Sequence, residues 1–348
     1  MKPTIPGRLH AQGLVQPRFD SAAEVVRHLG CMQSQLHDMA LWAVARRMRG
    51  ATLSSLQEAF DRGDFLRTHV LRPTWHLVDP ADIHWLQALT APRVGRLMAS
   101  SNTAIGLSEE RLDQGSAVIL DVLSDGMPHQ RAELASALGA AGLEHQGQAL
   151  AHIVMHAEIN ALIASGPMQG KQHTYVALPP QPVELTHDEL LAQAARRYAR
   201  GHGPFRDKDF AWWTSLTLTD SRRAIELAGL RPLETGGVAH WMLDDPVVIE
   251  APRVLLLSNF DEYISYARDP EDYAGFDGTA NDVMRGSGLL MIDGRLSGTW
   301  TRTITAKTVD IVVSRARQLS ATVRRRLDDE AAAFGRFVER EPRVVIAD

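Results

Sequence analysis

The sequence is poor in cysteine, since Cys31 is the single one in 348 residues. One thiol excludes an internal disulfide, and it excludes a zinc module built from several cysteine ligands. Long apolar runs are also missing: no stretch approaches the roughly 18 apolar residues of a membrane span, and the start, Met1 to Thr4, has no signal-peptide core. We therefore expect a cytoplasmic protein that has no membrane partner.

Lysine is scarce as well, with four lysines against 33 arginines and a formal net charge of −5. This net charge gives no global attraction to nucleic acid or to an anionic membrane. The arginines nevertheless gather in clusters, at 46–49, 93–96, 196–200, 222–223 and 324–326. Guanidinium groups suit phosphates, so two interpretations stay open: solvated helix faces, or parts of a polyanion-binding surface.

Familiar catalytic and cofactor signatures are also missing. The sequence has no phosphate-binding Walker loop, no dinucleotide fingerprint and no nucleophile elbow. His152 and His156 have helical spacing, but the segment lacks the glutamate of a metallohydrolase and an obvious third ligand. Asp261 and Glu262 are adjacent acids between a strand and a loop, where such a pair more often makes structural hydrogen bonds. We expect neither a metal nor a cofactor.

The middle of the chain has an informative order of predicted elements. Helices are predicted at about 109–123, 130–138 and 148–162, and two strands then flank a polar, glycine-rich tip at 166–172. Three helices followed by a two-stranded hairpin is the order of a winged helix. Because 348 residues exceed one ordinary core, we expect the chain to divide into two to four units.

The same order recurs on both sides of this segment. Upstream, three helices precede two strands, at 21–33, 38–48, 53–62, 65–70 and 74–78. Downstream the corresponding segments are 187–200, 207–216, 219–228, 230–234 and 238–243. After Pro252 strands predominate, at 254–257, 288–292, 296–304 and 309–313, before a helix at about 320–339. We predict an α+β protein of three tandem winged helices, at 1–100, 101–182 and 183–250, followed by a small antiparallel β-barrel-like unit at 251–348.

Two glutamines one residue apart, Gln33 and Gln35, follow the apolar stripe of the first of these helices. Ser21 and Glu24 have the spacing of a capping box that begins this helix. A glutamine side chain offers a donor and an acceptor without charge, so two at a frayed helix end could hold and orient a water. The alternative is a solvated helix end.

Five segments resemble the signature blocks of a known family. They are Gln33-Ser34-Gln35, Leu71 to Val78 (LRPTWHLV), Asp209 to Trp213 (DFAWW), Leu257 to Tyr263 (LSNFDEY) and Ile292 to Trp300 (IDGRLSGTW). In this order, over roughly residues 8 to 305, they closely resemble the bacterial tandem winged-helix DNA glycosylases. This AlkZ-like family includes azinomycin-resistance and interstrand-crosslink glycosylases.

The resemblance implies three winged helices and a β-barrel in a C-shaped arrangement around duplex DNA. It also implies that the protein excises alkylated purines, bulky or crosslinked ones included, and that Gln33 and Gln35 are catalytic. One position departs from the family, because the central residue of its motif is usually aliphatic and here it is Ser34. We expect this change to alter the packing behind the two glutamines.

The chemistry needed for this reaction agrees with these residues. A purine alkylated on a ring nitrogen is cationic and leaves without protonation, so the protein must position a water and stabilise an oxocarbenium-like transition state. Asp38 is the nearest carboxylate in the sequence, although an N-cap role is the alternative. A Schiff-base mechanism would require an amine, and the few lysines make it improbable. We predict a monofunctional glycosylase that leaves an abasic site.

The partner implied is double-stranded DNA carrying alkylated bases, bound by a monomer at the nucleoid. His76 and Trp75 lie in a family block and are candidates for catalysis or DNA contact. Further candidate DNA contacts are Arg46, Arg47, Arg72, Lys171 at the predicted wing tip, and Trp300. A non-catalytic winged-helix transcriptional regulator is the alternative, because winged helices are found in both kinds of protein.

Overall fold

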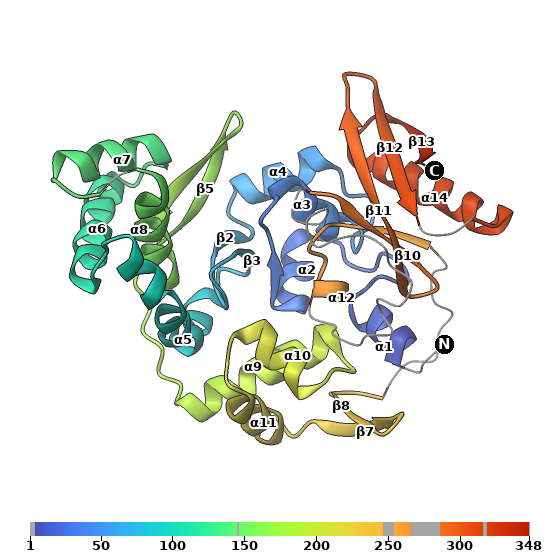
Figure 1. Ribbon diagram of the computed structural model, residues 1–348, viewed down its shortest axis with the longest axis horizontal. Helices are drawn as coiled ribbons and strands as arrows, with labels where there is room; N and C mark the ends of the chain where they lie inside the picture. The colour runs from blue at the N-terminus through green and yellow to red at the C-terminus, as the bar shows by residue number, and fades with distance from the viewer. Residues whose placement is uncertain (1–3, 145, 246–253, 266–285, 316–318, 348) are drawn as a thin grey trace. The chain divides into compact units, whose positions relative to one another are not determined.

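The computed structural model describes residues 4–144, 146–245, 254–265, 286–315 and 319–347 (Figure 1). By contact, the chain divides into two units. Unit 1 comprises Met1–Glu58, Arg196–Phe210 and Gly229–Asp348, and unit 2 comprises Ala59–Ala195 and Ala211–Ala228. The predicted boundary between residues 250 and 251 lies outside the described residues, and the division into four parts stays a prediction.

Unit 1 begins with short elements, α1 (Thr4–Ala11), α2 (Ala22–Leu29), β1 (Cys31–Gln33), α3 (His37–Ala45) and most of α4 (Leu53–Asp61). The predicted start of α2 is confirmed, because the Ser21 side chain accepts a hydrogen bond from the Glu24 backbone N–H. Its predicted end at residue 33 is wrong. Gly30 has a φ of 85°, a conformation that glycine adopts without strain, and the chain continues from there as the strand β1.

The C-terminal part of unit 1 is a five-stranded sheet in the order β13-β12-β11-β10-β9. The strands are β9 (Val254–Leu257), β10 (Gly288–Ile292), β11 (Arg295–Ile304), β12 (Thr308–Arg315) and β13 (Glu341–Ala347). The prediction of a purely antiparallel unit is wrong at one edge, where β13 pairs parallel with β12. Helix α14 (Ala321–Phe337) connects these two strands, as a crossover between parallel strands requires.

Aromatic side chains form the contact between α14, α3 and this sheet. The ring of Phe334 packs edge-on against both Trp42 and Trp300, with ring centroids 5.0 Å apart in each pair. The indole N–H of Trp300 donates to the Leu257 carbonyl at 2.8 Å. A Cβ on Gly288 would lie 2.2 Å from the Trp300 ring nitrogen, so only glycine fits beside this indole. Figure 1 shows α14 lying along the sheet.

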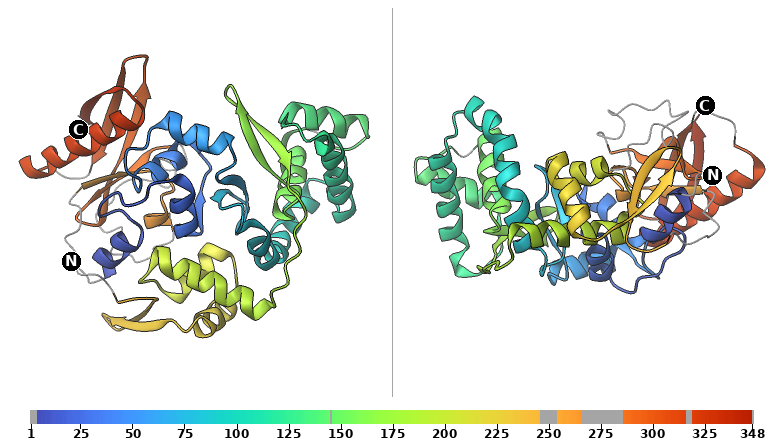
Figure 2. Two further views of the ribbon diagram at one scale, coloured as in Figure 1. Left: turned by 180° about the vertical axis from the view of Figure 1, so that it is seen from behind. Right: turned by 90° about the horizontal axis from the view of Figure 1, so that it is seen from below.

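Unit 2 contains the order expected of a winged helix, α6, β4, α7, α8, β5 and β6. Their bounds are α6 (Glu109–Val122), β4 (His129–Gln130), α7 (Arg131–Ala140), α8 (Gly147–Ile159), β5 (Ile163–Gln169) and β6 (Gln172–Ala177). The short 3-10 helix η1 (Leu123–Asp125) follows α6. The three helices share one apolar core with Ile163 and Tyr175 of the hairpin. Figures 1 and 2 show the β5–β6 hairpin extending beyond these helices.

A second hairpin in unit 2, β2 (Leu66–His69) and β3 (Trp75–Val78), confirms the two strands predicted upstream. It joins the first hairpin, because Arg67 pairs with Ser165, and the strands run in the order β3-β2-β5-β6-β4. The sequence analysis does not predict the helix that follows, α5 (Ile83–Ala104), which contains Pro92. A proline inside a helix removes a hydrogen bond, and α5 is held by packing of Val94 against α8.

The downstream predictions of three helices and a hairpin are also confirmed. The elements are α9 (His187–His202), α10 (Asp207–Thr214), α11 (Leu218–Leu227), β7 (Arg231–Thr235) and β8 (Val238–Met242). The division between the units falls within α9 and within α10. A single helical turn, α12 (Glu262–Ser265), follows β9. In the described part of the chain, no helix is long and apolar enough to cross a membrane.

Candidate active site

The paired glutamines lie in unit 1, where Gln33 is the last residue of β1 and Gln35 lies on the segment between β1 and α3. Ser34 is fully buried, whereas Gln33 and Gln35 on either side of it are half-buried. Alternating burial of this kind is typical of an extended chain, in which successive side chains point to opposite sides. The spacing of the motif therefore places the two amides on the more open side and the middle residue inside. This geometry corrects the expectation of a helix end.

The backbone of Gln33 is held by a buried carboxylate. Its N–H donates to Glu262 Oε1 at 2.8 Å, and Glu262 is 2% exposed. The other carboxylate oxygen lies 3.2 Å from Nε2 of His202 at the end of α9. The ring of His202 stacks on Tyr198, with centroids 4.2 Å apart and planes 8° from parallel. The sequence analysis missed His202, which no motif marks, and treated Glu262 as structural.

The neighbouring acid, Asp261, has a separate partner. Both of its carboxylate oxygens accept hydrogen bonds from Arg47, at 2.8 and 3.0 Å. Arg47 also donates to the Gln12 backbone carbonyl and to the Gln12 side chain, each at 2.8 Å. Both charged side chains are fully buried. The structural role expected for Asp261 therefore agrees with these contacts.

Two of the residues predicted to contact DNA, Arg47 and Trp300, are buried inside unit 1, and these two predictions are wrong, whereas a DNA contact of Arg46 stays a prediction. Arg47 is bound to Asp261 in the interior. The Arg46 side chain is 11% exposed, forms an ion pair with Glu330 at 3.1 Å and lies over the Trp42 ring. Trp300 is buried in the core between the sheet and α14. Sequence position alone cannot separate these internal roles from surface ones, because each partner lies far away along the chain.

Asp38 is exposed in the first turn of α3. The N-cap of this helix is Leu36, so the alternative assignment of Asp38 as an N-cap is wrong. A carboxylate in the first turn is favoured by the helix dipole. The charge of Asp38 acts on Arg302 of β11. Burial lowers the pKa of Arg302, and the negative charge of Asp38 partly raises it again. The sequence analysis did not identify Arg302.

In unit 2, His76 is buried, and its ring contacts residues of the loop that precedes it. One ring nitrogen, Nδ1, lies 2.8 Å from the Thr74 carbonyl, and Nε2 lies 3.3 Å from the Arg72 guanidinium. Burial, and next the charge of Arg72, lower the pKa of His76 well below its ordinary value. The ring is therefore neutral at pH 7, donates from Nδ1 and accepts from Arg72. A buried side chain makes no direct DNA contact, and His76 instead fixes Arg72.

Trp75 and Lys171 occupy different positions in unit 2. The Trp75 ring is half-buried between His69, with centroids 4.4 Å apart, and Arg67, whose Cζ is 4.4 Å from the ring centroid. Arg67 is buried, and burial lowers its pKa to about 10. His69 is in turn paired with the buried Glu158. Lys171 is exposed in the turn between β5 and β6, as the prediction of a wing-tip lysine requires.

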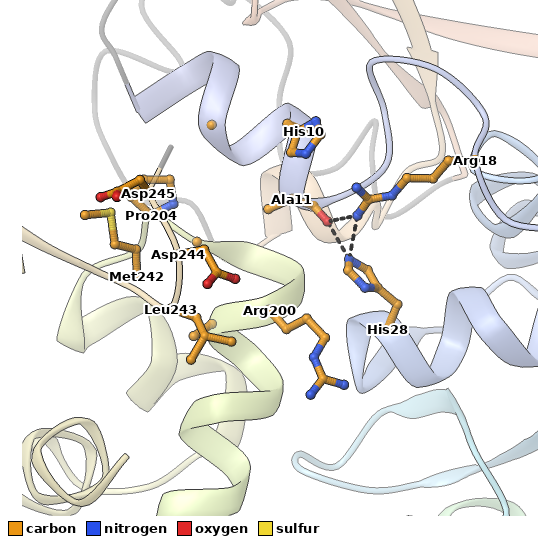
Figure 3. Close-up of a pocket in the computed structure, with 13 residues that line it drawn as sticks. His10, Ala11, Arg18, His28, Arg200, Pro204, Met242, Leu243, Asp244 and Asp245 are labelled. Atoms are coloured by element: carbon orange, nitrogen blue, oxygen red, sulfur yellow. Dashed lines mark hydrogen bonds between the residues drawn. The ribbon is translucent and has the colours of Figure 1, made fainter. Parts of the chain in front are cut away.

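Unit 1 also contains a cavity of about 250 Å³ that the sequence analysis missed (Figure 3). Arg18 and His28 both point to the Ala11 carbonyl in its wall, at 3.1 and 2.6 Å. Burial is the main cause that lowers the pKa of His28 to about 4, and nearby cations, Arg18 and Arg200 among them, add to it. The wall includes neither of the paired glutamines.

The described residues thus define a class of protein: a chain of helix-and-hairpin modules with a C-terminal sheet and a paired-glutamine segment anchored on a buried acid. The family described as "DNA glycosylase AlkZ-like" matches residues 26–337, and the chain belongs to this family.

Two relatives support the assignment. The curated "Interstrand DNA cross-link repair glycosylase" of Streptomyces sahachiroi is 23% identical over 323 residues, which cover 84% of this chain and 85% of that protein. Among solved structures, the Streptomyces sahachiroi DNA glycosylase AlkZ matches with a TM-score of 0.78 and 21% identity over the whole of both chains. This structural similarity shows the fold. Within the described residues, no group of three or more histidine, cysteine or acidic side chains could hold a metal ion.

Proposed function

We propose that this protein is a monofunctional DNA glycosylase that hydrolyses the N-glycosidic bond of alkylated purines in duplex DNA. The observation that carries the proposal is the Gln33-Ser34-Gln35 segment, whose middle residue is buried while both amides lie toward the more open side. Family membership supports the glycosylase function over the alternative of a winged-helix regulator.

The proposed reaction begins with a cationic alkylated base, which leaves as a neutral purine. Gln33 and Gln35 hold the attacking water through their side-chain amides, each of which offers both a donor and an acceptor. Asp38 is exposed close by in the sequence, and its charge favours the oxocarbenium-like transition state. The water attacks the anomeric carbon as the bond to the base breaks; the electrons of that bond neutralise the departing purine, the water loses one proton to solvent, and the product is an abasic site.

The positions of the lysines support a monofunctional reaction. Lys171 is in an exposed hairpin turn of unit 2, and Lys208 is in the first turn of α10. Lys307 is exposed between β11 and β12. Surface lysines of this kind lack the desolvated surroundings that usually activate a Schiff-base lysine as a nucleophile. The reaction should therefore proceed without a covalent enzyme–DNA intermediate.

The range of substrates follows from the relative rather than from the site. The name of the Streptomyces sahachiroi protein describes interstrand DNA cross-link repair, and we propose that bulky and crosslinked purine adducts are also substrates here. We further propose that the protein acts as a monomer, in the cytoplasm at the nucleoid.

The direct test is incubation of the protein with duplex DNA that contains one N7-alkylated guanine. We expect base release and strand cleavage only after alkali, with no complex trapped by borohydride. Strand cleavage without alkali, together with a trapped complex, would contradict the monofunctional reaction. Tight binding without base release from either a methylated or a bulky adduct would instead favour the regulator.

A further inference from the structure

We propose that Glu262 and His202 form a positioning pair that fixes the backbone of Gln33 in its catalytic geometry. This inference rests on the proposed role of Gln33 in holding the attacking water. Neither residue reaches solvent, because Glu262 and His202 are 2% and 3% exposed, so each acts through Gln33 and not on the substrate.

Glu262 binds the backbone of Gln33 directly. Glu262 Oε1 accepts the Gln33 backbone N–H at 2.8 Å, and the two residues are 229 positions apart. Hydrogen bonds to a carboxylate are shorter and stronger than those to a neutral carbonyl. Gln33 is the last residue of β1, so this bond holds the chain at the point where it leaves regular structure and enters the motif.

His202 supports the carboxylate of Glu262. His202 Nε2 lies 3.2 Å from Glu262 Oε2, and Nδ1 lies 3.2 Å from the Tyr198 carbonyl. Each neighbour offers an oxygen that accepts a hydrogen bond from a ring N–H, so the imidazole is held between the Glu262 carboxylate and the Tyr198 carbonyl. Burying a lone carboxylate is costly unless an opposite charge and hydrogen bonds compensate. The stacked Tyr198 ring fixes the plane of the imidazole.

The adjacent acid, Asp261, has different partners. Asp261 and Glu262 are 1% and 2% exposed, and Asp261 directly precedes α12, of which Glu262 is the first residue. Asp261 binds Arg47, which also donates to Gln12, and accepts the Tyr263 backbone N–H, so these contacts hold the framework and not the motif. Glu262 binds the motif. Two neighbouring acids therefore hold the turn and the glutamine separately, which provides a matched control.

A small movement of Gln33 matters because the water must lie between two amides and the anomeric carbon. Displacement of a positioned group by about 1 Å can cost on the order of 100-fold in rate. Loss of the Glu262 bond frees the Gln33 backbone without removing its amide side chain. The effect should therefore appear in the chemical step and not in DNA affinity.

The experiment compares Glu262→Ala, Glu262→Gln and the control Asp261→Asn under single-turnover conditions, at a temperature where all remain folded. We expect Glu262→Ala to slow base release by roughly 10- to 100-fold with DNA Kd within about twofold. Glu262→Gln retains an oxygen acceptor for Gln33 and should recover most of the rate. Asp261→Asn should lower Tm but keep the rate within about twofold, since the Gln33 bond is intact.

Amide hydrogen exchange at Gln33 provides a readout independent of activity. Protection of this N–H should be lost in Glu262→Ala and kept in Glu262→Gln and Asp261→Asn. Equal rate losses in Glu262→Ala and Asp261→Asn, in proportion to their Tm, would overturn the positioning role. If Gln33→Ala itself keeps the native rate, the proposed function of Gln33 fails; if Gln33→Ala is inactive and Glu262→Ala is fully active, only the positioning pair fails.

Discussion

Arg47 of unit 1 and the pair Arg72 and Lys171 of unit 2 look alike in the sequence but differ in the fold. Arg47 is fully buried, and its guanidinium is satisfied by Asp261, Gln12 and the Ala43 carbonyl. In unit 2, Arg72 is only half-buried and is held by a neutral His76, and Lys171 is exposed. An acid that neutralises an arginine makes it a structural element, whereas the neutral imidazole of His76 orients the Arg72 guanidinium without neutralising it.

The largest effect should follow from Arg47→Met. This change leaves the Asp261 carboxylate buried without its counter-ion, and breaking such a pair costs about 3–5 kcal/mol. Denaturant unfolding should show this loss. DNA affinity of the folded fraction should be unchanged; a weaker affinity with native stability would restore Arg47 as a DNA contact.

His28 should produce a pH-dependent effect in unit 1. Because its pKa is lowered to about 4 in the fold, the unfolded chain binds the proton more readily. The contribution of neutral His28 to the free energy of unfolding is fully present above about pH 6.5. It is lost as the pH falls toward 4, by roughly 3 kcal/mol at most. His28→Gln removes this titration.

The measurement is the free energy of unfolding of both proteins at several pH values between 4 and 7.5. The difference between the two free energies should narrow as the pH falls, because only the unmutated protein is destabilised by protonation of His28. Parallel profiles over this range would contradict the assignment.

Arg72→Ala should weaken DNA binding by about tenfold, the equivalent of about 1.4 kcal/mol for a charge-assisted contact. His76→Ala should weaken binding in the same direction but less, because Arg72 keeps its charge and loses its orientation. Fluorescence anisotropy with duplex DNA measures both. Arg111, a surface arginine paired with Glu144, provides the control, and an equal loss in Arg111→Ala would mean that general charge is responsible.

The smallest effect is expected for Lys171→Ala, because exposed charges contribute little individually. We expect about a twofold loss of affinity and a decrease of about one in the slope of log affinity against log salt. An unchanged slope would show that the β5–β6 turn does not contact a phosphate.

The sequence predicted the parts of the fold that local patterns determine. The modules at 109–177 and 187–242 have regular apolar spacing with glycine turns, and both are confirmed. Helix α5 was missed because Pro92 interrupts its pattern while distant packing preserves it. Strand β13 was missed because the helix at about 320–339 is the last predicted element, whereas α14 ends at Phe337, Glu339 has a positive φ of 57°, and the chain continues as a strand.

The sequence predicted the two glutamines of the candidate site but not the residues that hold them. Gln33 and Gln35 are recognisable as a pair in the sequence, and the extended backbone that explains their spacing became evident only in the fold. The residues that hold Gln33 come from positions 202 and 262. No local pattern links such distant residues, and the same limitation caused Arg47 and Trp300 to be assigned to the surface.

The most direct test of the account is the single-turnover rate of base release from alkylated duplex DNA for the native protein, Gln33→Ala and Gln35→Ala. We predict that each variant loses on the order of 100-fold or more in rate, as expected when a water-positioning group is removed, while DNA affinity and Tm stay near native. Native rates in both variants would contradict the assignment of the catalytic water to this pair.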